Sequence, residues 1–347
     1  MKDRAFEKPI VIKRINQFVR EVRHNGNKIG ITPRQLIIDY DNTCNFSCKF
    51  CYELQDRKYN GTHLSIQELS DIADQAYDMG IWEVIFQGGE MLCLFDDFIK
   101  ILDAFKPERF RMVLVTNGYL LTEERARILK EHGMDCVGIS ISGMDSAKHN
   151  ADRGGCRDAH QKALSALDNV QQAGMTPWAQ VVFGHHNSHS KDLFDLLDYL
   201  KEKSYATYFI LAMPYGIYKD DCLDANDIRI FNNIRHEYKT SFDTWDFYDS
   251  KRERITGCWA GNRLFITPKG DVLPCPFINV SLGNVHEKQL KDIYDFGMTI
   301  KWFKENSPVC LSAQNRQFRR KYLDGLSTSM FHPEDAHNIF KEDIINE

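Results

Sequence analysis

Residues 41–53 read DNTCNFSCKFCYE and hold three cysteines, Cys44, Cys48 and Cys51. The stretch directly follows a predicted strand at residues 35–40, so the three thiolates share one short loop. Three thiolates can bind three corners of an iron–sulfur cluster and leave its fourth iron open, whereas a structural zinc site is closed by four ligands. No fourth cysteine or histidine lies close by in the sequence. The pattern predicts a cluster-binding loop, with zinc or buried, metal-free cysteines as the alternatives.

A regular alternation of strands and helices extends from this loop. We predict strands at residues 35–40, 82–86, 111–115, 136–141, 178–183 and 205–211. Helices are predicted between them at residues 65–79, 96–105, 122–133, 158–173 and 191–203. This order indicates an α/β protein with a parallel sheet and right-handed crossovers. An open doubly wound sheet and a partial barrel both fit, and in either the loops at the carboxyl ends of the strands carry the chemistry.

Composition excludes several classes of protein. The 347 residues are 43% apolar and 27% charged, with a net charge of -5, so neither nucleic acid nor a membrane is an expected partner. The N-terminus does not read as a signal peptide, and no apolar stretch approaches the length of a membrane span. We therefore expect a soluble cytoplasmic protein. In such a reducing compartment its ten cysteines are more often metal ligands or redox groups than disulfides.

The cysteine loop, with the aromatic Tyr52 after it, resembles that of the radical SAM superfamily. The resemblance implies a partial (β/α)6 TIM-like barrel and a 4Fe–4S cluster whose open iron binds S-adenosylmethionine (SAM). One electron, expected from a flavodoxin- or ferredoxin-type donor, would cleave SAM to a 5'-deoxyadenosyl radical that abstracts a hydrogen atom from the substrate. A non-catalytic iron–sulfur electron carrier is the alternative from another class, and it would need no SAM site.

Further motifs resemble the family's SAM site. Gln87 to Glu90 read QGGE after the second strand, where two glycines permit close backbone approach and the carboxylate supplies an anionic acceptor. In the family this motif contacts the SAM amino group. Residues 116–118, TNG, end the third strand. The resemblance implies that the residues binding SAM are Tyr52, Gly88, Gly89, Glu90, Asn117, Ser140 and Arg153.

A second set of cysteines follows the barrel. Cys258 and Cys275 frame a predicted hairpin with a turn at residues 268–270, which would bring the two thiols close together. This region resembles the SPASM or twitch extension of radical SAM enzymes. The resemblance implies one auxiliary 4Fe–4S cluster on Cys258, Cys275 and Cys310, with its fourth ligand absent or supplied by Cys222. A zinc site or buried cysteines are the alternatives.

The predicted organisation has four parts. Residues 1–34 form an N-terminal helical extension, with a helix at residues 10–24. The barrel spans residues 35–215, a linker containing a helix spans residues 216–255, and the auxiliary cluster domain spans residues 256–347.

Three residues are candidates for catalytic roles. Cys93 follows the QGGE motif, and either it or Cys222 could donate a hydrogen atom to a substrate radical. His185 ends the fifth strand, where it could bind substrate or act as a base.

The function predicted from these features is hydrogen abstraction from a small polar substrate, such as a sugar or an aminocyclitol. Oxidation is the expected outcome, with the auxiliary cluster accepting the second electron. Peptide-modifying relatives often carry an extra N-terminal domain, and residues 1–34 are too short for one. A peptide-modifying maturase and an epimerase with a cysteine hydrogen donor are the alternatives.

Overall fold

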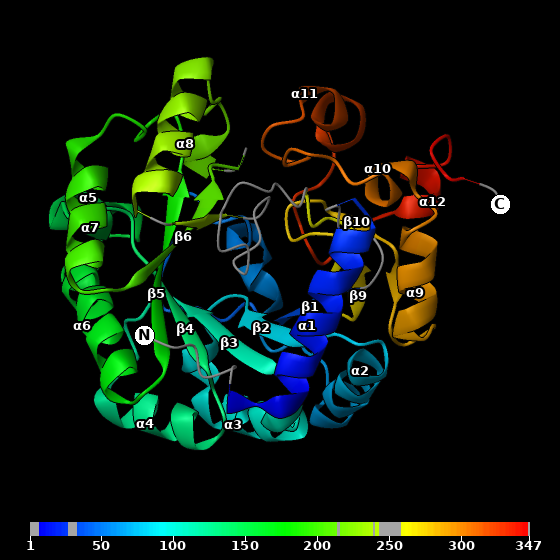
Figure 1. The fold of residues 1–347 in the computed structure, drawn as a ribbon, viewed down its shortest axis with the longest axis horizontal. Coiled ribbons are helices and arrows are strands. Elements are labelled where there is room, and N and C mark those ends of the chain that lie inside the picture. The colour runs from blue at the N-terminus through cyan, green and yellow to red at the C-terminus, as the bar shows by residue number, and fades with distance from the viewer. Residues whose placement is uncertain (1–6, 27–32, 214–215, 239, 243–257, 346–347) are drawn as a thin grey trace.

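The computed structural model describes residues 7–26, 33–213, 216–238, 240–242 and 258–345. Its centre is a curved sheet of ten strands in the order β11-β9-β8-β1-β2-β3-β4-β5-β6-β7 (Figure 1). The six predicted strands are present and run parallel: β1 (Gln35–Asp39), β2 (Glu83–Gln87), β3 (Arg111–Thr116), β4 (Cys136–Ser140), β5 (Thr176–Phe183) and β6 (Ala206–Leu211). The sheet curves around a central space, so the partial barrel is confirmed and the flat doubly wound sheet is wrong.

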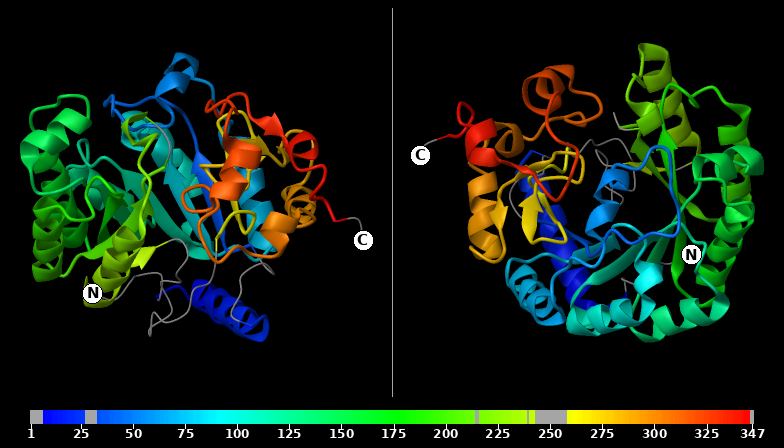
Figure 2. Two further views of the ribbon diagram at one scale, coloured as in Figure 1. Left: turned by 90° about the horizontal axis from the view of Figure 1, so that it is seen from above. Right: turned by 180° about the vertical axis from the view of Figure 1, so that it is seen from behind.

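The crossover helices cover the outside of the barrel (Figures 1 and 2). The five predicted helices are α2 (Ile66–Asp78), α3 (Phe95–Ala104), α4 (Glu123–Glu131), α6 (Ala159–Gln172) and α7 (Lys191–Glu202). In α7, the leucines spaced three and four residues apart are buried against the sheet. The N-terminus of α2 has the capping box expected from its sequence, since Ser65 and Glu68 exchange side-chain to backbone hydrogen bonds. The short helix α5 (Ser146–Asp152) was not predicted.

The C-terminal region extends the barrel sheet. Strand β8 (Arg263–Ile266) pairs in parallel with β1, placing Leu264 opposite Leu36. Strand β9 (Asp271–Leu273) pairs antiparallel with β8, which confirms the predicted hairpin, and β11 (Gly283–Asn284) pairs with β9. The prediction of a separate domain after residue 256 did not anticipate this pairing, because two short strands do not reveal their partner in sequence.

Helix α1 (Pro9–His24) closes the end of the barrel where the strands begin (Figure 2). The ring of Phe18 packs on Trp82, just before β2, and on Trp259, just before β8, with centroids 6.2 and 5.9 Å apart. Lys8 Nζ reaches Asp135 at 2.5 Å, and Arg14 donates to the carbonyl of Ile81 at 2.7 Å. The N-terminal extension is therefore fixed to the barrel by a buried aromatic contact and by polar contacts on either side.

The remaining elements lie after β6 and around the hairpin. Helix α8 (Ala225–Tyr238) is the helix expected in the linker, and β7 (Ser241–Phe242) adds an edge strand, while residues 243–257 are outside the described residues. Around the hairpin lie α9 (Leu290–Gly297), α10 (Lys301–Lys304), α11 (Arg316–Phe318), α12 (Ala336–Ile339) and a small sheet of β10 (Val280–Ser281) and β12 (Glu334–Asp335). Short helical turns are η2 (Leu54–Tyr59), η3 (Met91–Leu94), η4 (Pro107–Arg109), η5 (Gly216–Tyr218) and η6 (Arg319–Leu323). Within the described ranges, every helix is too short or too polar to cross a bilayer.

Candidate SAM and iron–sulfur site

One cavity occupies the interior of the barrel. It extends from the cysteine loop, where the strands end, to the polar side chains of Arg34, Glu83 and Arg111, where the strands begin. Its lining includes Cys44, Cys48 and Cys51 together with all seven predicted SAM-binding residues: Tyr52, Gly88, Gly89, Glu90, Asn117, Ser140 and Arg153. The structure therefore brings into one cavity residues that are spread over more than a hundred positions in the sequence.

The three cysteines of the loop are partly or fully buried. A tight turn places the N–H of Cys51 3.2 Å from the carbonyl oxygen of Cys48. Burial raises the pKa of Cys44 and of Cys51 to about 12, so both would be neutral thiols without a bound metal. Binding iron offsets the cost of burying a charged thiolate, because the ligand shares its negative charge with the metal cation.

The spacing of the sulfur atoms favours a cluster over a single ion. Ligands of one zinc ion lie about 3.8 Å apart, given a zinc–sulfur bond of about 2.3 Å in a tetrahedron. Among the described residues, only His185, Asp224 and Asp227 have three candidate ligand atoms all within 4.8 Å of one another. Neither cysteine triad is that compact, which suits a multi-iron cluster better than zinc.

The QGGE segment packs directly against the chain entering the cysteine loop. The N–H of Gly89 donates to the carbonyl of Asp41 at 3.1 Å, and the N–H of Glu90 donates to that of Thr43 at 2.8 Å. Gly88 has a φ of +130°, and a Cβ there would lie 2.2 Å from Asp39 Oδ1. Gly88 is thus required by its φ and by the side chain that ends β1, whereas Gly89 is required by the loop backbone, since a Cβ there would lie 2.4 Å from the carbonyl oxygen of Thr43.

Glu90 joins the end of β2 to the end of β3. Its Oε1 accepts from Thr116 Oγ1 at 2.7 Å and from the N–H of Leu92 at 3.1 Å, while Oε2 accepts from the N–H of Asn117 at 2.8 Å. Burial raises its pKa, and these three hydrogen bonds oppose that rise. Since a carboxylate has about four acceptor positions, one remains for a ligand in the cavity.

Arg153 is a buried cation at the cavity wall. It is 7% exposed, its Nη1 lies 3.9 Å from Cys48 Sγ, and its guanidinium lies over the ring of Phe50 at 5.0 Å. Its Nε is buried and has no hydrogen-bond partner among the described residues. An unpaired donor on a planar guanidinium is suited to an incoming carboxylate, which SAM possesses.

Two buried carboxyl groups beside the loop escaped the sequence prediction. Asp39 ends β1, is 1% exposed, and has no partner for either oxygen among the described residues. Burial, followed by repulsion from Glu53, raises the pKa of Asp39 well above its ordinary value, and burial raises the pKa of Glu53 to about 7. The signal available in the sequence was the acidic residues on both sides of the loop, in IIDYD and CYE.

The three C-terminal cysteines lie together, as the hairpin predicted for Cys258 and Cys275 and as the resemblance implied for Cys310. Cys258, Cys275 and Cys310 are all buried. A hydrogen bond with Cys310 lowers the pKa of Cys258 to about 7, and the same bond together with burial raises the pKa of Cys310. These residues fit the three-cysteine set of an auxiliary cluster. Cys222 is exposed on the loop before α8, and its assignment as fourth ligand stays a prediction.

The candidate catalytic residues lie outside the cavity lining. Cys93 is partly buried, with its Sγ 4.0 Å from Asn45 Oδ1, and Cys222 is exposed. The side chain of His185 is 58% exposed. None of the three is among the residues lining the cavity, so their catalytic roles stay predictions.

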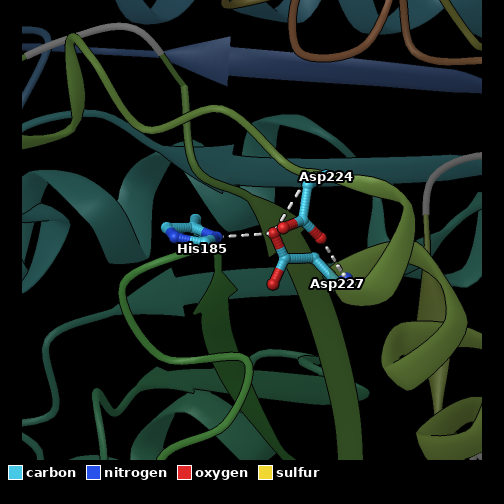
Figure 3. A group of neighbouring side chains, drawn as sticks. All are labelled: His185, Asp224 and Asp227. Carbon is cyan, nitrogen blue, oxygen red and sulfur yellow. Dashed lines mark hydrogen bonds and ion pairs between the residues drawn. The ribbon is translucent and has the colours of Figure 1, made fainter.

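His185 belongs to a polar group that joins the loop after β5 to helix α8 (Figure 3). Its Nδ1 lies 2.7 Å from Asp227 Oδ2, which also accepts from the N–H of Asp224 at 2.8 Å. Asp224 in turn accepts from the N–H of Asp227, and Ser188 donates to the other Asp227 oxygen. Asp224 thus caps α8, and the oxygens of Asp227 are occupied by Asp224, His185 and Ser188, which is a structural role.

Comparisons with known proteins agree with this geometry. A model of the radical SAM superfamily matches residues 40–200, and a model of the SPASM iron–sulfur cluster-binding domain matches residues 258–317. The chain is 25% identical over 283 residues to the AdoMet-dependent heme synthase of Nitratidesulfovibrio vulgaris (73% of this chain, 76% of the relative). It is 25% identical over 255 residues to the PqqA peptide cyclase of Streptomyces rochei (70% and 69%). Its fold matches that of Streptococcus suis SuiB bound to S-adenosylmethionine, with a TM-score of 0.61 at 21% identity (81% of this chain, 69% of SuiB).

Proposed function

Because the chain belongs to the radical SAM superfamily and carries a C-terminal SPASM domain, we propose that it modifies a peptide by hydrogen abstraction from a side chain held in the barrel cavity. The enzyme's cofactors are SAM, a 4Fe–4S cluster on the loop of Cys44, Cys48 and Cys51, and an auxiliary iron–sulfur cluster in the SPASM domain. When bound, the first cluster and SAM supply a 5'-deoxyadenosyl radical.

The residues of the chain bind and orient the reactants. Arg153 offers its buried Nε to the SAM carboxylate, and the remaining acceptor position of Glu90 suits the SAM amino group. The backbone contacts of Gly89 and Glu90 fix the distance between this pair and the cysteine loop. Such fixed positions favour hydrogen transfer, because reacting atoms must be held in one geometry.

The wall of the cavity is the observation that carries the substrate class. Aromatic side chains line much of it, among them Phe50, Tyr52, Trp178, Tyr208, Tyr218 and Phe277. Trp178 lies across the bare backbone of Gly138, where a Cβ would be 1.9 Å from its Nε1, and its ring is 4.9 Å from that of Tyr208. This wall excludes water and suits an apolar or aromatic amino-acid side chain.

The sugar or aminocyclitol favoured by the sequence is not supported. The inference against a peptide rested on the short N-terminal extension, which says nothing about the cavity. Two similar proteins named PqqA peptide cyclase, each 25% identical, favour a peptide.

Oxidation is the outcome we propose. The SPASM triad of Cys258, Cys275 and Cys310 gives the chain a second redox site, which an epimerase has no need for. Joining two atoms of a peptide into a ring removes two hydrogens, so cyclisation is also an oxidation. Epimerisation would instead require a thiol facing the substrate. Cys93 and Cys222 do not line the cavity, and Cys136, which does, lies at the end where the strands begin and accepts a hydrogen bond from Arg111 Nη2 at 3.0 Å.

The experiment has two stages. First, dithionite-reduced protein should produce 5'-deoxyadenosine from SAM. Second, the reduced protein is incubated in deuterated water with a set of short synthetic peptides, each with one aromatic or apolar residue. A peptide product two mass units lighter, without solvent deuterium at the reacting carbon, supports the proposal. Peptides left unchanged while a small metabolite is consumed would overturn the substrate class, and an unchanged formula carrying one deuterium would indicate epimerisation.

A further inference from the structure

One polar side chain of the barrel interior has no partner within the protein. Gln180 lies in strand β5, is half-buried and lines the cavity. Among the residues that the structure describes, none forms a hydrogen bond with its side-chain amide. Such an amide has two N–H donors and a carbonyl acceptor, and polar groups inside proteins are almost always paired. A ligand in the cavity is therefore the expected partner of Gln180.

Strand pairing places Gln180 at the height of the predicted SAM site. Ser140 on β4 lies opposite Gln180 in the sheet, and Gln180 lies opposite Tyr208 on β6 (Figure 1). All three side chains line the cavity. Because neighbouring strands are about 4.8 Å apart, a group bound by Gln180 would lie beside a group bound by Ser140.

This position matters because Ser140 is the residue expected to contact the ribose of SAM. The 5'-carbon, to which the hydrogen atom is transferred, is attached to that ribose. Hydrogen transfer needs the reacting atoms to be about 3–3.5 Å apart, so the substrate has to lie beside the ribose. The residues predicted to bind SAM come from β1 to β4 and the loops that follow these strands, whereas Gln180 is on the next strand. Gln180 thus lies next to the SAM site, where the substrate has to be.

The surroundings of Gln180 favour a neutral group. Trp178 and Val182, two residues before and after it on β5, also line the cavity, as do Ala206 and Ile210 beside them on β6. The side chains opposite Gln180 on both neighbouring strands are uncharged. A carboxylate or an ammonium group bound at this height would be buried without an adjacent counter-charge, which is costly.

The backbone of a peptide offers a neutral group of the right kind. In an extended chain the N–H and the C=O of one residue point to the same side, as in the residue pairs of an antiparallel sheet that exchange two hydrogen bonds. The amide of Gln180 can form the same two bonds, because its NH2 donates to the C=O and its carbonyl oxygen accepts from the N–H. The side chain of the bound residue can then lie against the apolar wall near Trp178.

We propose that Gln180 binds the backbone N–H and C=O of the peptide residue that is modified, and holds this residue extended beside the ribose of SAM. The proposal rests on the function proposed above and names the part of the peptide that the barrel recognises. Because both hydrogen bonds are to the backbone, Gln180 positions the reacting residue without selecting its side chain. Selection of the side chain falls to the aromatic wall.

The test pairs a change in the protein with a change in the peptide. The probe is the synthetic peptide that the protein modifies in the experiment above, made with an ester oxygen in place of the N–H of the modified residue X. Gln180→Met keeps the length of the side chain and removes its hydrogen bonds. Each change alone should raise KM for the peptide about tenfold. In Gln180→Met the ester should have little further effect, because the bond it removes is already absent.

Two controls separate this contact from general effects. An ester at the residue after X removes an N–H that points to the opposite side of an extended peptide, so its effect should be equal in the wild type and in Gln180→Met. Gln172→Met, at the exposed end of α6, should keep the wild-type KM for every peptide. Calorimetric titration should give the same Kd for SAM in Gln180→Met and in the wild type.

Three results would overturn the assignment of Gln180 to the peptide backbone. The ester at X could raise KM by the same factor in the wild type and in Gln180→Met, or Gln180→Met could leave KM for the unaltered peptide unchanged. A higher Kd for SAM in Gln180→Met would place Gln180 in the SAM site instead. If the wild type cleaves SAM but modifies no peptide of the set, the function proposed above is refuted, and the role of Gln180 is refuted with it.

Discussion

A Cβ on Gly89 would lie 2.4 Å from the carbonyl oxygen of Thr43, the residue immediately before Cys44. The second glycine of QGGE is therefore in backbone contact with the chain that enters the cysteine loop. The N–H of Glu90 donates to the same carbonyl. The motif that resembles a SAM-binding element thus also fixes the position of the cysteine loop.

The substitution Gly89→Ala should displace the loop. Because the clash is with backbone, the loop must move, at a cost of about 1–3 kcal/mol typical of overpacking. We expect reduced iron content and at least a tenfold loss of 5'-deoxyadenosine formation, measured after anaerobic reconstitution. The control Gly325→Ala changes a glycine with a φ of +96° and nothing within 4 Å of its Cβ position, so it adds backbone strain without a steric clash. Equal activity of the two variants would contradict a role for the Gly89 contact.

The barrel could be predicted from the sequence because its signals are local. Each predicted strand and crossover helix lies within about two residues of its observed position, and the capping box at Ser65 is present as predicted. The pairing of β8 with β1 could not be predicted, since it joins residues more than two hundred positions apart through a four-residue strand. The sequence of a short strand shows that its residues are buried, but it does not show which other strand they pair with.

The two cysteine triads should bind iron independently. Replacing Cys44, Cys48 and Cys51 by alanine should abolish SAM cleavage yet leave about four irons on the SPASM cysteines, as one 4Fe–4S cluster requires. Replacing Cys258, Cys275 and Cys310 should remove the iron of the SPASM domain and leave about four irons on the cysteine loop, with SAM cleavage retained. Iron content and electron paramagnetic resonance measure both. Zinc in place of iron in the first variant would show that the C-terminal site is a structural zinc site.

Arg153 should act on SAM affinity. Arg153→Ala removes the buried donor, and a lost hydrogen bond to a charged group is worth about 1.5–3 kcal/mol, so the Kd for SAM should rise roughly 10- to 100-fold. Arg153→Lys keeps the positive charge but lacks the planar fork of the guanidinium. Its Kd for SAM should therefore lie between those of the wild type and Arg153→Ala. Calorimetric titration of SAM into the reconstituted protein measures the effect. Unchanged affinity in Arg153→Ala, with normal iron content, would place the SAM carboxylate elsewhere.

Sequence motifs predicted the residues proposed to bind SAM, which the structure brings into one cavity, but not the buried groups beside them. Tyr52 directly follows the last cysteine of the loop, and Arg153 is assigned because its segment HNADRGG resembles one of the family; both line the cavity. Asp39 and His149 are equally buried beside the site, at 1% exposure each, but neither belongs to a motif. Whether a polar side chain points inward depends on tertiary packing, which a single sequence does not specify.

His149 should make stability depend on pH. It is buried on α5, where its Nδ1 accepts from the N–H of Ser142 at 3.3 Å, and burial lowers its pKa to about 3, with smaller effects from Arg153 and His160. An unfolded histidine has a pKa of about 6.5, so below that pH the unfolded state binds more protons than the folded state. The stabilising contribution of neutral His149 should therefore be fully present above pH 6.5 and be lost as the pH drops toward 3. At pH 5.5 the free energy of unfolding should be about 1.4 kcal/mol lower on this account.

The variant His149→Gln isolates this contribution, because the glutamine oxygen can accept from the Ser142 N–H but does not titrate. Between pH 7.5 and 5.5 the variant should lose about 1.4 kcal/mol less unfolding free energy than the wild type, measured by urea denaturation. The control His24→Gln replaces an exposed histidine at the end of α1 and should follow the wild-type curve. If wild type and His149→Gln lose stability in parallel over this range, His149 is charged in the folded protein, and the buried contact with Ser142 does not hold it neutral.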